Sequence, residues 1–290
     1  MRGAPLSAAQ AELVAGLAAA ARAADGVMPL SEHALLHAAH PDAQEAPARD
    51  LLMIVGGQAV AYAHLDDSGD GELVVHPGHR RQGHASALLG ALAGSGETRI
   101  WAHGDLPAAA GLARARGFTR ARALWQMRRP LTAELPRPAF PPGVTLRTFV
   151  PGQDEDAWLA VNARAFAHHP EQGAWTRADV ALREAEPWFD PAGFFLAERD
   201  GHLAGFHWTK VHPDGPDGAP EGEVYVVGID PGQQGGGLGR ALTLAGLRYL
   251  RDRGLAHVML YVDEDNAAAT RTYTSLGFTR ATTDVMYQRA

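Results

Sequence analysis

The sequence predicts a mixed α/β protein that contains two copies of one fold. A strand that ends in a glycine-containing turn and opens a helix occurs twice, within residues 73–92 and within residues 224–253. Gly117-Phe118-Thr119-Arg120, late in the first half, is repeated as Gly277-Phe278-Thr279-Arg280 near the end of the chain. Two matched turns and two matched endings at similar separations indicate an internal duplication.

A proline-rich segment separates the two halves. Five prolines fall within residues 129–143. Proline removes amide donors and fixes backbone angles, so this stretch is predicted to be an extended linker. We therefore expect a first domain at residues 1–130, a linker at 131–143 and a second domain at 144–290.

The first half opens with an alanine-rich segment, Met1 to Ala24, that is interrupted by Gln10, Glu12 and Arg22. This pattern favours an amphipathic helix over a signal peptide. Further along, an apolar strand at 73–75 leads into the turn at 80–85, and the turn leads into a helix at 86–92.

The second half repeats this order with a richer turn. A strand at 224–229 precedes Gln234-Gly235-Gly236-Gly237-Leu238-Gly239, and a helix is predicted from Arg240 to about Arg253. The next apolar run, His257 to Val262, is predicted to be a strand.

Composition limits the classes of function. The 290 residues carry a net charge of −7, and the sequence pI is about 6.0. A nucleic-acid partner is therefore not expected. The chain has no cysteine, which excludes disulfides, thiolate metal sites and cysteine nucleophiles. No run approaches the ~20 apolar residues of a membrane-spanning helix, so we expect a cytoplasmic protein with no membrane partner.

The glycine turns suggest an anion site. A strand–turn–helix connection points several backbone N–H groups, together with the positive end of the helix dipole, toward one spot where a phosphate can bind. A tight connection without a ligand remains an equal alternative on this evidence alone. A P-loop is excluded because Arg240-Ala241 follows the glycines in place of Lys-Ser/Thr.

A second pattern follows the last predicted strand. The segment from Asn266 to Phe278 reads N-x-x-A-x-x-x-Y-x-x-x-G-F, and helical spacing places Asn266, Ala269, Thr270 and Tyr273 on one face. The alternative for Tyr273 is a core aromatic residue. In the first half the equivalent positions are Leu106 and Ala113, so that half is a poor candidate for catalysis.

Both patterns resemble those of the GCN5-related N-acetyltransferase (GNAT) family. The first is the glycine turn, which has the spacing Q/R-x-x-G-x-G/A at residues 234–239 and 80–85, and the second is the segment from Asn266 to Phe278. The resemblance implies two tandem GNAT domains, acetyl-CoA as cosubstrate and acetyl transfer to an amine. Glu223 is the expected base and Tyr273 the acid that protonates the departing sulfur. A backbone N–H near Val227 would polarise the thioester carbonyl. The alternative for Glu223 is a solvated charge at the start of a strand.

The resemblance also places the acetyl-CoA contacts. In the second half they fall on Val227, Gly228, Ile229, Gln234, Gly235, Gly236, Gly237, Leu238, Gly239, Arg240, Asn266, Ala267, Ala268, Ala269, Thr270 and Arg271. In the first half they fall on Leu73, Val74, Val75, Arg81, Gln82, Gly83, His84, Ala85 and Ser86.

Segments 205–213, 222–231 and 260–266 are most similar to tandem members of the family from actinobacteria. This similarity implies a small-molecule partner, cysteinyl-glucosaminyl-inositol, acetylated on its cysteine amine. The implied substrate contacts are Glu32, Glu171, Lys210, Glu223 and Tyr261. Glu32 could instead be a helix start capped by Ser31.

Other functions stay open. The chain could acetylate another amine, such as an aminoglycoside or a peptide N-terminus, or it could be a non-catalytic acetyl-CoA sensor. A tandem pair can satisfy the pairing needs of the fold within one chain, so a monomer is expected. His168-His169, His207 and His212 lack a third ligand at metal-site spacing, so no metal is expected.

Overall fold

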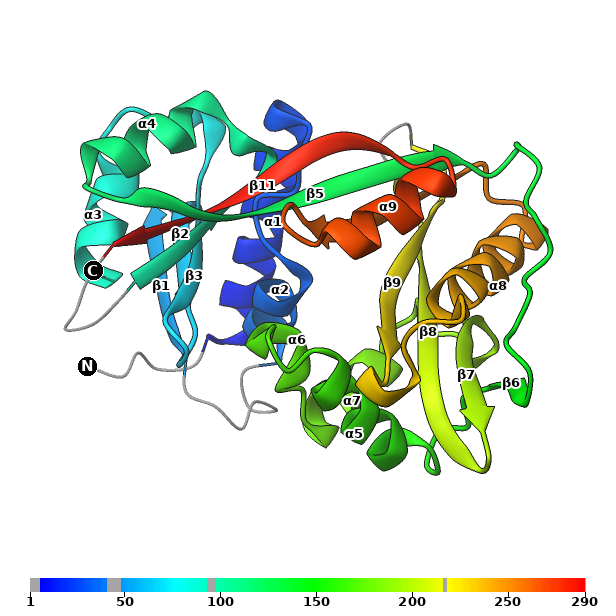
Figure 1. Cartoon of the computed structure of the whole chain (residues 1–290). Coiled ribbons are helices and arrows are strands. Elements are labelled where there is room, and N and C mark those ends of the chain that lie inside the picture. Colours follow the sequence, from blue (N-terminus) through cyan, green and yellow to red (C-terminus); the bar gives the residue numbers. More distant parts are fainter. Residues whose placement is uncertain (1–5, 41–47, 93–97, 216–217, 290) are drawn as a thin grey trace. The chain divides into compact units, whose positions relative to one another are not determined.

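The computed structural model describes residues 6–40, 48–92, 98–215 and 218–289, without the side chains of residues 170 and 171. Contacts divide the chain into two compact units. The first consists of Met1–Trp125 with Thr282–Ala290, and the second of Gln126–Ala281. The last strand of the chain therefore completes the first unit (Figure 1).

The first unit is a sheet with helices on both faces. Its sheet order is β1-β2-β3-β4-β11-β5, in which β3 and β4 are parallel and β1–β2, β2–β3 and β4–β11 are antiparallel. Its elements are α1 (Ala8–Asp25), α2 (Glu32–Ala39), β1 (Arg49–Val55), β2 (Gln58–Leu65), β3 (Asp70–Val75), η2 (Pro77–His79), α3 (His84–Leu92), β4 (Thr98–Ala102), η3 (His103–Asp105), α4 (Pro107–Ala115), the start of β5 (Thr119–Pro130) and the end of β11 (Thr279–Arg289).

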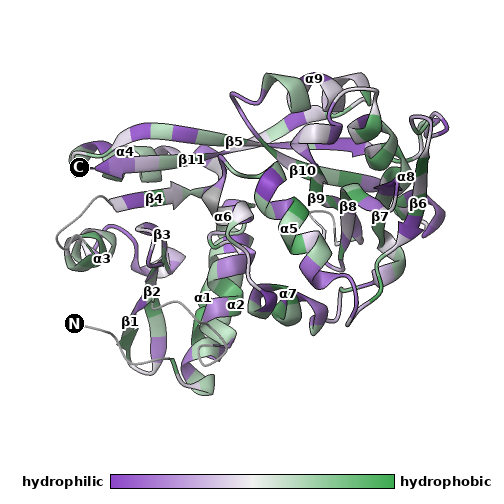
Figure 2. Ribbon diagram, turned by 60° about the horizontal axis from the view of Figure 1, so that its bottom comes forward, coloured by the Kyte–Doolittle hydropathy of each residue, from purple (hydrophilic) through white to green (hydrophobic). Residues whose placement is uncertain are grey.

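Alternation along the strands builds two cores in this unit. Tyr62 and Val74 pack with α1 and α2, whereas Ala61 and Ala63 pack with α3 on the opposite face. Helix α1 begins after the N-cap Ser7 and buries an apolar stripe, so the amphipathic helix predicted at the start is confirmed. The helices of Figure 2 carry both hydrophobic and hydrophilic residues, as expected for helices that bury one face.

The second unit has the same layered plan, with sheet order β5-β10-β9-β8-β7-β6. Its predicted strands, turn and helix at 224–262 are confirmed. Its elements are the end of β5, β6 (Val144–Thr148), α5 (Glu155–Ala165), α6 (Pro170–Gly173), α7 (Arg177–Glu184), η4 (Pro191–Gly193), β7 (Phe194–Arg199), β8 (His202–His212), β9 (Glu221–Ile229), η5 (Pro231–Gln233), α8 (Leu238–Asp252), β10 (His257–Asp263), α9 (Ala267–Ser275) and the start of β11.

Large aromatic side chains fill one face of the second sheet. Trp208 stacks on Phe194 with ring centroids 4.4 Å apart, and Trp158 meets both rings edge-on. Helix α8 covers the other face, along β8 and β9 (Figure 1). It approaches β8 at Gly246, where a Cβ atom would overlap the imidazole of His207, so the close helix–strand contact depends on this glycine.

Strands β9 and β10 pair only briefly. Their parallel register runs from Val258↔Gly222 to Leu260↔Val224, while β9 stays paired with β8 as far as Ile229. Beyond Val224, the β10-facing edge of β9 is therefore free of ladder pairs within the described residues. In the part of the chain that the structure describes, no helix has the length and apolar character needed to cross a bilayer.

Candidate active site

The turn before α8 is shaped by three consecutive glycines in the left-handed region. Gly235, Gly236 and Gly237 have φ angles of 87°, 61° and 84°, which other residues adopt only at a cost. Gly237 is the N-cap of α8, and among the described residues no side chain caps this helix end. The first N–H groups of the helix are thus available to an anion.

Side chains fix the approach to this turn. Asp230 accepts a hydrogen bond from the Gly232 amide at 2.9 Å and pairs with Arg164 at 2.7 Å. Arg199 donates to the side-chain oxygen of Gln233 at 2.6 Å. The turn is therefore held by its surroundings as well as by its glycines.

Two predicted site residues lie on the first turns of the helices that follow the strands. Arg240 donates to Ser275 Oγ at 2.6 Å, which ties α8 to α9. Asn266 is the N-cap of α9, and its side-chain oxygen accepts from the Ala269 amide at 3.1 Å. Both therefore have structural roles in this region.

The predicted base, Glu223, is buried on β9. Its cross-strand partner on β8 is Lys210, and its Oε2 atom lies 2.7 Å from Nε2 of His212. The His212 side chain is 31% exposed, whereas that of Glu223 is 8% exposed. The pair therefore connects a buried carboxylate to solvent through an imidazole.

Charged and aromatic groups surround this pair. Lys210 Nζ lies over the Trp188 ring at 4.3 Å and over the Tyr225 ring at 5.1 Å, so cation–π attraction stabilises its buried charge. Burial raises the pKa of Glu221, which pairs with Arg128 at 3.1 Å. The site thus brings acidic and basic side chains together in buried positions.

The predicted acid, Tyr273, is partly buried on α9. Its ring meets Phe278 edge-on at 5.8 Å, and within the described residues its hydroxyl makes no hydrogen bond. Burial raises the pKa of Tyr273 to about 12. The hydroxyl is therefore protonated at neutral pH and can donate a hydrogen bond. Thr270 Oγ1, on the same face, is buried and has no partner within those residues.

The other predicted substrate residues are spread over the chain. Tyr261 is 42% exposed on β10, and its hydroxyl accepts a hydrogen bond from Gln126 at 3.0 Å. Glu171 lies in α6, but its side chain is outside the described residues. Glu32, in the first unit, is the first residue of α2 after the N-cap Ser31. This helix start is the alternative that the sequence analysis gave for Glu32.

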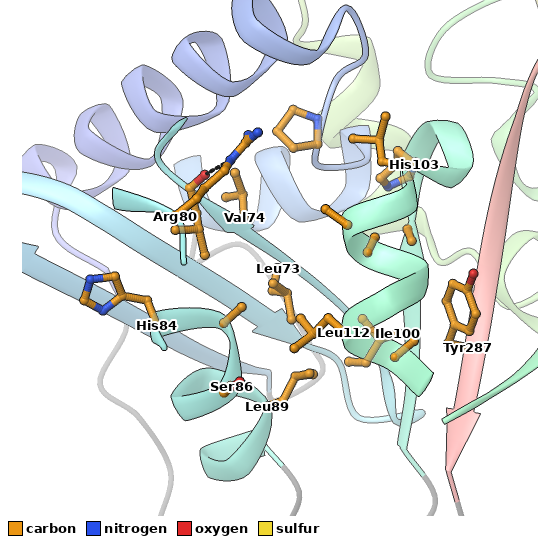
Figure 3. Close-up of a pocket in the computed structure, with 18 of the residues that line it drawn as sticks. Leu73, Val74, Arg80, His84, Ser86, Leu89, Ile100, His103, Leu112 and Tyr287 are labelled. Atoms are coloured by element: carbon orange, nitrogen blue, oxygen red, sulfur yellow. Dashed lines mark hydrogen bonds between the residues drawn. The ribbon is translucent and has the colours of Figure 1, made fainter. Parts of the chain in front are cut away.

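The first unit contains a pocket of about 430 Å³ at its own strand–turn–helix connection (Figure 3). Every first-half residue predicted to contact acetyl-CoA lines it except Gln82. Arg80, which begins the Q/R-x-x-G-x-G/A spacing, forms a two-pronged salt bridge with Asp25 at 2.7 and 2.6 Å. Its guanidinium therefore secures the turn to the end of α1.

Leu106 and Ala113 take the places on α4 that Asn266 and Tyr273 take on α9. Leu106 is the N-cap residue of α4, but its apolar side chain cannot form a capping hydrogen bond. Ala113 follows seven residues later in the same helix. Both line the pocket. The first unit thus keeps the cavity but supplies neither the amide nor the hydroxyl.

Sequence reasoning missed three groupings that only folding creates. It considered His212 solely as a metal ligand, although the structure pairs it with Glu223. It did not find the buried network of His103 with Asp284 and Glu72. It also did not find a cluster of two histidines and Asp50 in the first unit. No spacing in the sequence signals these contacts, because each joins separate elements.

Comparison with known proteins adds family evidence. Residues 160–278 match the Acetyltransferase (GNAT) family. The chain is 62% identical over 284 residues to the mycothiol acetyltransferase of Thermobispora bispora, covering 96% of this chain and 95% of that protein. It is 60% identical over 287 residues to the mycothiol acetyltransferase of Thermomonospora curvata, covering 96% and 93%.

Solved structures agree on the fold. A GCN5-related N-acetyltransferase from Sphaerobacter thermophilus matches with a TM-score of 0.66 and 25% identity, covering 98% of this chain and 93% of that one. A tandem GNAT protein from the clavulanic acid biosynthesis pathway matches with a TM-score of 0.71 and 20% identity, covering 97% and 94%. The predicted fold, two tandem acetyltransferase domains with mixed sheets, is confirmed.

Proposed function

The chain belongs to the mycothiol acetyltransferases of the GNAT family, and on this premise we propose that it transfers acetyl from acetyl-CoA to the cysteine amine of cysteinyl-glucosaminyl-inositol. One observation carries the assignment of the active half. The second unit combines a buried carboxylate, an unpartnered tyrosine hydroxyl and an uncapped glycine turn, whereas the first has only leucine and alanine at the two equivalent helix positions.

We assign the pyrophosphate of acetyl-CoA to the turn at residues 234–240. Three left-handed glycines and the uncapped start of α8 offer converging N–H donors. The pantetheine arm would follow β9 at residues 227–229 and α9 at residues 266–271. The buried hydroxyl of Thr270 gives this arm a polar partner.

The chemistry then requires two proton transfers. Glu223 removes a proton from the attacking amine, either directly or through a water. His212 then takes this proton from Glu223 and releases it to solvent. The amine nitrogen bonds to the acetyl carbon, and the carbon–sulfur bond breaks. Tyr273 donates a hydrogen bond, and finally the proton, to the departing thiolate. A backbone N–H on the edge of β9 stabilises the oxyanion between these steps.

Recognition of the amine substrate is assigned to four polar side chains, three in the second unit and Glu32 in the first. Lys210 and Tyr261 can hydrogen-bond sugar or inositol hydroxyls, while Glu171 and Glu32 can attract the ammonium. These four assignments rest on the family resemblance. Single alanine variants test them: each should raise the KM of the amine while leaving the KM of acetyl-CoA in place.

The first unit is proposed to bind acetyl-CoA without turning it over. Its pocket gathers the predicted contact residues, which supports binding, and Leu106 and Ala113 supply no catalytic group. Two acetyl-CoA molecules per chain are expected by calorimetry. The protein is further proposed to act in the cytoplasm as a monomer, which analytical ultracentrifugation would test for the oligomeric state.

The deciding experiment measures CoA thiol release from acetyl-CoA with cysteinyl-glucosaminyl-inositol, beside free cysteine and an aminoglycoside. Turnover specific to the pseudodisaccharide is expected, with a loss of roughly 10²–10⁴-fold in Glu223→Gln. Glu134→Gln is the control, because Glu134 is exposed in the segment that follows β5. Turnover only with another amine would discard the substrate. No turnover with any amine would favour the acetyl-CoA sensor.

A further inference from the structure

Three metal-binding side chains meet in the first unit, away from the acetyl-transfer chemistry. They are His37 on α2, Asp50 on β1 and His64 on β2, and one ligand atom of each lies within 4.8 Å of the other two. Their side chains are 9%, 5% and 3% exposed. Such burial of a carboxylate between two imidazoles is uncommon unless the group is fully paired or binds a cation.

The fold brings these three residues together from strands β1 and β2 and from helix α2, which packs on the same face of the sheet. Asp50 and His64 are direct partners in the antiparallel register of β1 and β2, so their side chains share one face. Tyr62, two residues before His64, lies on the same face and donates its hydroxyl hydrogen to Asp50 Oδ1 at 2.6 Å. Helix α2 packs over this face and contributes His37.

The spacing of the ligand atoms suits a tetrahedral ion. His64 Nδ1 lies 3.0 Å from Asp50 Oδ1, and His37 Nδ1 lies 3.4 Å from Asp50 Oδ2. Two ligands bound at 2.0–2.1 Å to a tetrahedral zinc ion are about 3.3 Å apart. The two observed separations lie on either side of that value.

Hydrogen bonding alone leaves this cluster incomplete. His37 Nδ1 is buried and forms no hydrogen bond within the described residues; it lies 3.4 Å from Asp50 Oδ2, at ion-pair distance only. A metal ion bound at His37 Nδ1 would give this buried nitrogen a ligand bond.

From this geometry we propose that the first unit holds a structural divalent metal site, with Zn²⁺ as its ion and His37, Asp50 and His64 as ligands. Two imidazoles and one carboxylate form a donor set that zinc favours. Water can take the fourth position. The ion would join α2 to the edge hairpin of the sheet, a role separate from acetyl transfer.

The test uses the full-length chain without a histidine tag, treated with a chelator and desalted. ZnCl₂ is titrated by calorimetry, and bound metal is counted by elemental analysis after a second desalting. We expect one Zn²⁺ per chain, retained after desalting, together with a thermal midpoint several degrees above that of the chelated protein. With Co²⁺, the absorption bands of a tetrahedral site should appear.

Variants locate the ion. Asp50→Asn and His64→Ala should each weaken Zn²⁺ binding by at least 10-fold, and His37→Gln serves if either fails to fold. The control is His79→Ala, which disrupts another histidine group, His76, His79 and His84, with ring centroids 5.5 and 6.5 Å apart. Loss of binding in His79→Ala alone, or no zinc retained by the unmodified chain, would overturn the proposal.

Discussion

The Nε2 atom of His212 lies 2.7 Å from the Oε2 atom of Glu223, at the point where β8 and β9 run side by side. The imidazole is partly exposed and the carboxylate is buried. Glu223, the base that we propose, must release the proton that it accepts in each turnover, and this contact gives a route to solvent. It also fixes the orientation of the carboxylate.

Replacing His212 tests that route. A hydrogen bond to a charged group contributes about 1.5–3 kcal/mol, so His212→Ala should lower kcat by roughly 10- to 100-fold. The KM of acetyl-CoA should change little, because the glycine turn is untouched. His212→Asn, whose amide can still donate to Glu223, should recover part of the loss. Steady-state kinetics with an unchanged kcat in His212→Ala would remove His212 from the mechanism.

Local patterns explain what the sequence predicts well. The glycine turn and the helix after it are signalled within residues 224–253, where three glycines in a row permit a left-handed backbone. The placement of Tyr273 on a helix follows in the same way from a short repeat of period 3.6. The sequence therefore located these elements to within about three residues.

Non-local contacts explain what the sequence does not predict. His212 meets Glu223 only because the register of β8 and β9 pairs His212 with Glu221 and Lys210 with Glu223. The residues between the two strands contain no signal that sets this register. The sequence also does not predict that residues 282–289 complete the sheet of the first unit by pairing with β4. The partners of a strand depend on the whole fold and not on its own residues.

The protonation state of Tyr273 predicts the alkaline side of the rate profile. Because burial raises its pKa to about 12, the hydroxyl stays protonated through the range in which the enzyme can be assayed. The profile of kcat/KM should rise as the substrate amine loses its proton near pH ~7.7–8.0 and then stay level to about pH 10.

Tyr273→Phe supplies the comparison for this profile. It should lower kcat by about 10²–10⁴-fold without changing the shape of the alkaline limb. A fall in activity between pH 8 and 10 that occurs in the unmodified enzyme and is absent in Tyr273→Phe would show that this hydroxyl ionises there, against the burial argument.

Two glycines with the same backbone angle separate strain from ligand binding. Gly237 and Gly254 both have φ of 84°, and at either position a Cβ atom would meet nothing within 4 Å. Alanine at each should therefore cost about 1–2 kcal/mol of unfolding free energy. Only Gly237→Ala should also raise the KM of acetyl-CoA, by roughly 10-fold, because only Gly237 opens α8 toward the anion. Equal KM values in the two variants would argue against the pyrophosphate assignment.

A buried histidine in the first unit predicts how stability depends on pH. His103 Nδ1 lies 2.9 Å from Asp284 Oδ2, and His103 Nε2 lies 3.7 Å from Glu72 Oε2. Burial alone would lower the pKa of His103, but the two carboxylates raise it to about 10. In the unfolded chain the value is about 6.5, so the folded protein holds a proton that the unfolded chain releases.

The stabilisation from His103 is therefore complete below about pH 6.5 and is lost as pH rises through about 10. Between these values the unfolding free energy should fall with pH, by at most about 1.4 kcal/mol per pH unit from this group. Urea unfolding of the unliganded protein at pH 7, 8 and 9 measures the slope. His103→Gln should be less stable at pH 7 and should flatten the slope, whereas His202→Gln, at an exposed position, should retain it. A wild-type slope that persists in His103→Gln would assign the pH dependence to other groups, and His103 would then be neutral within its carboxylate pair.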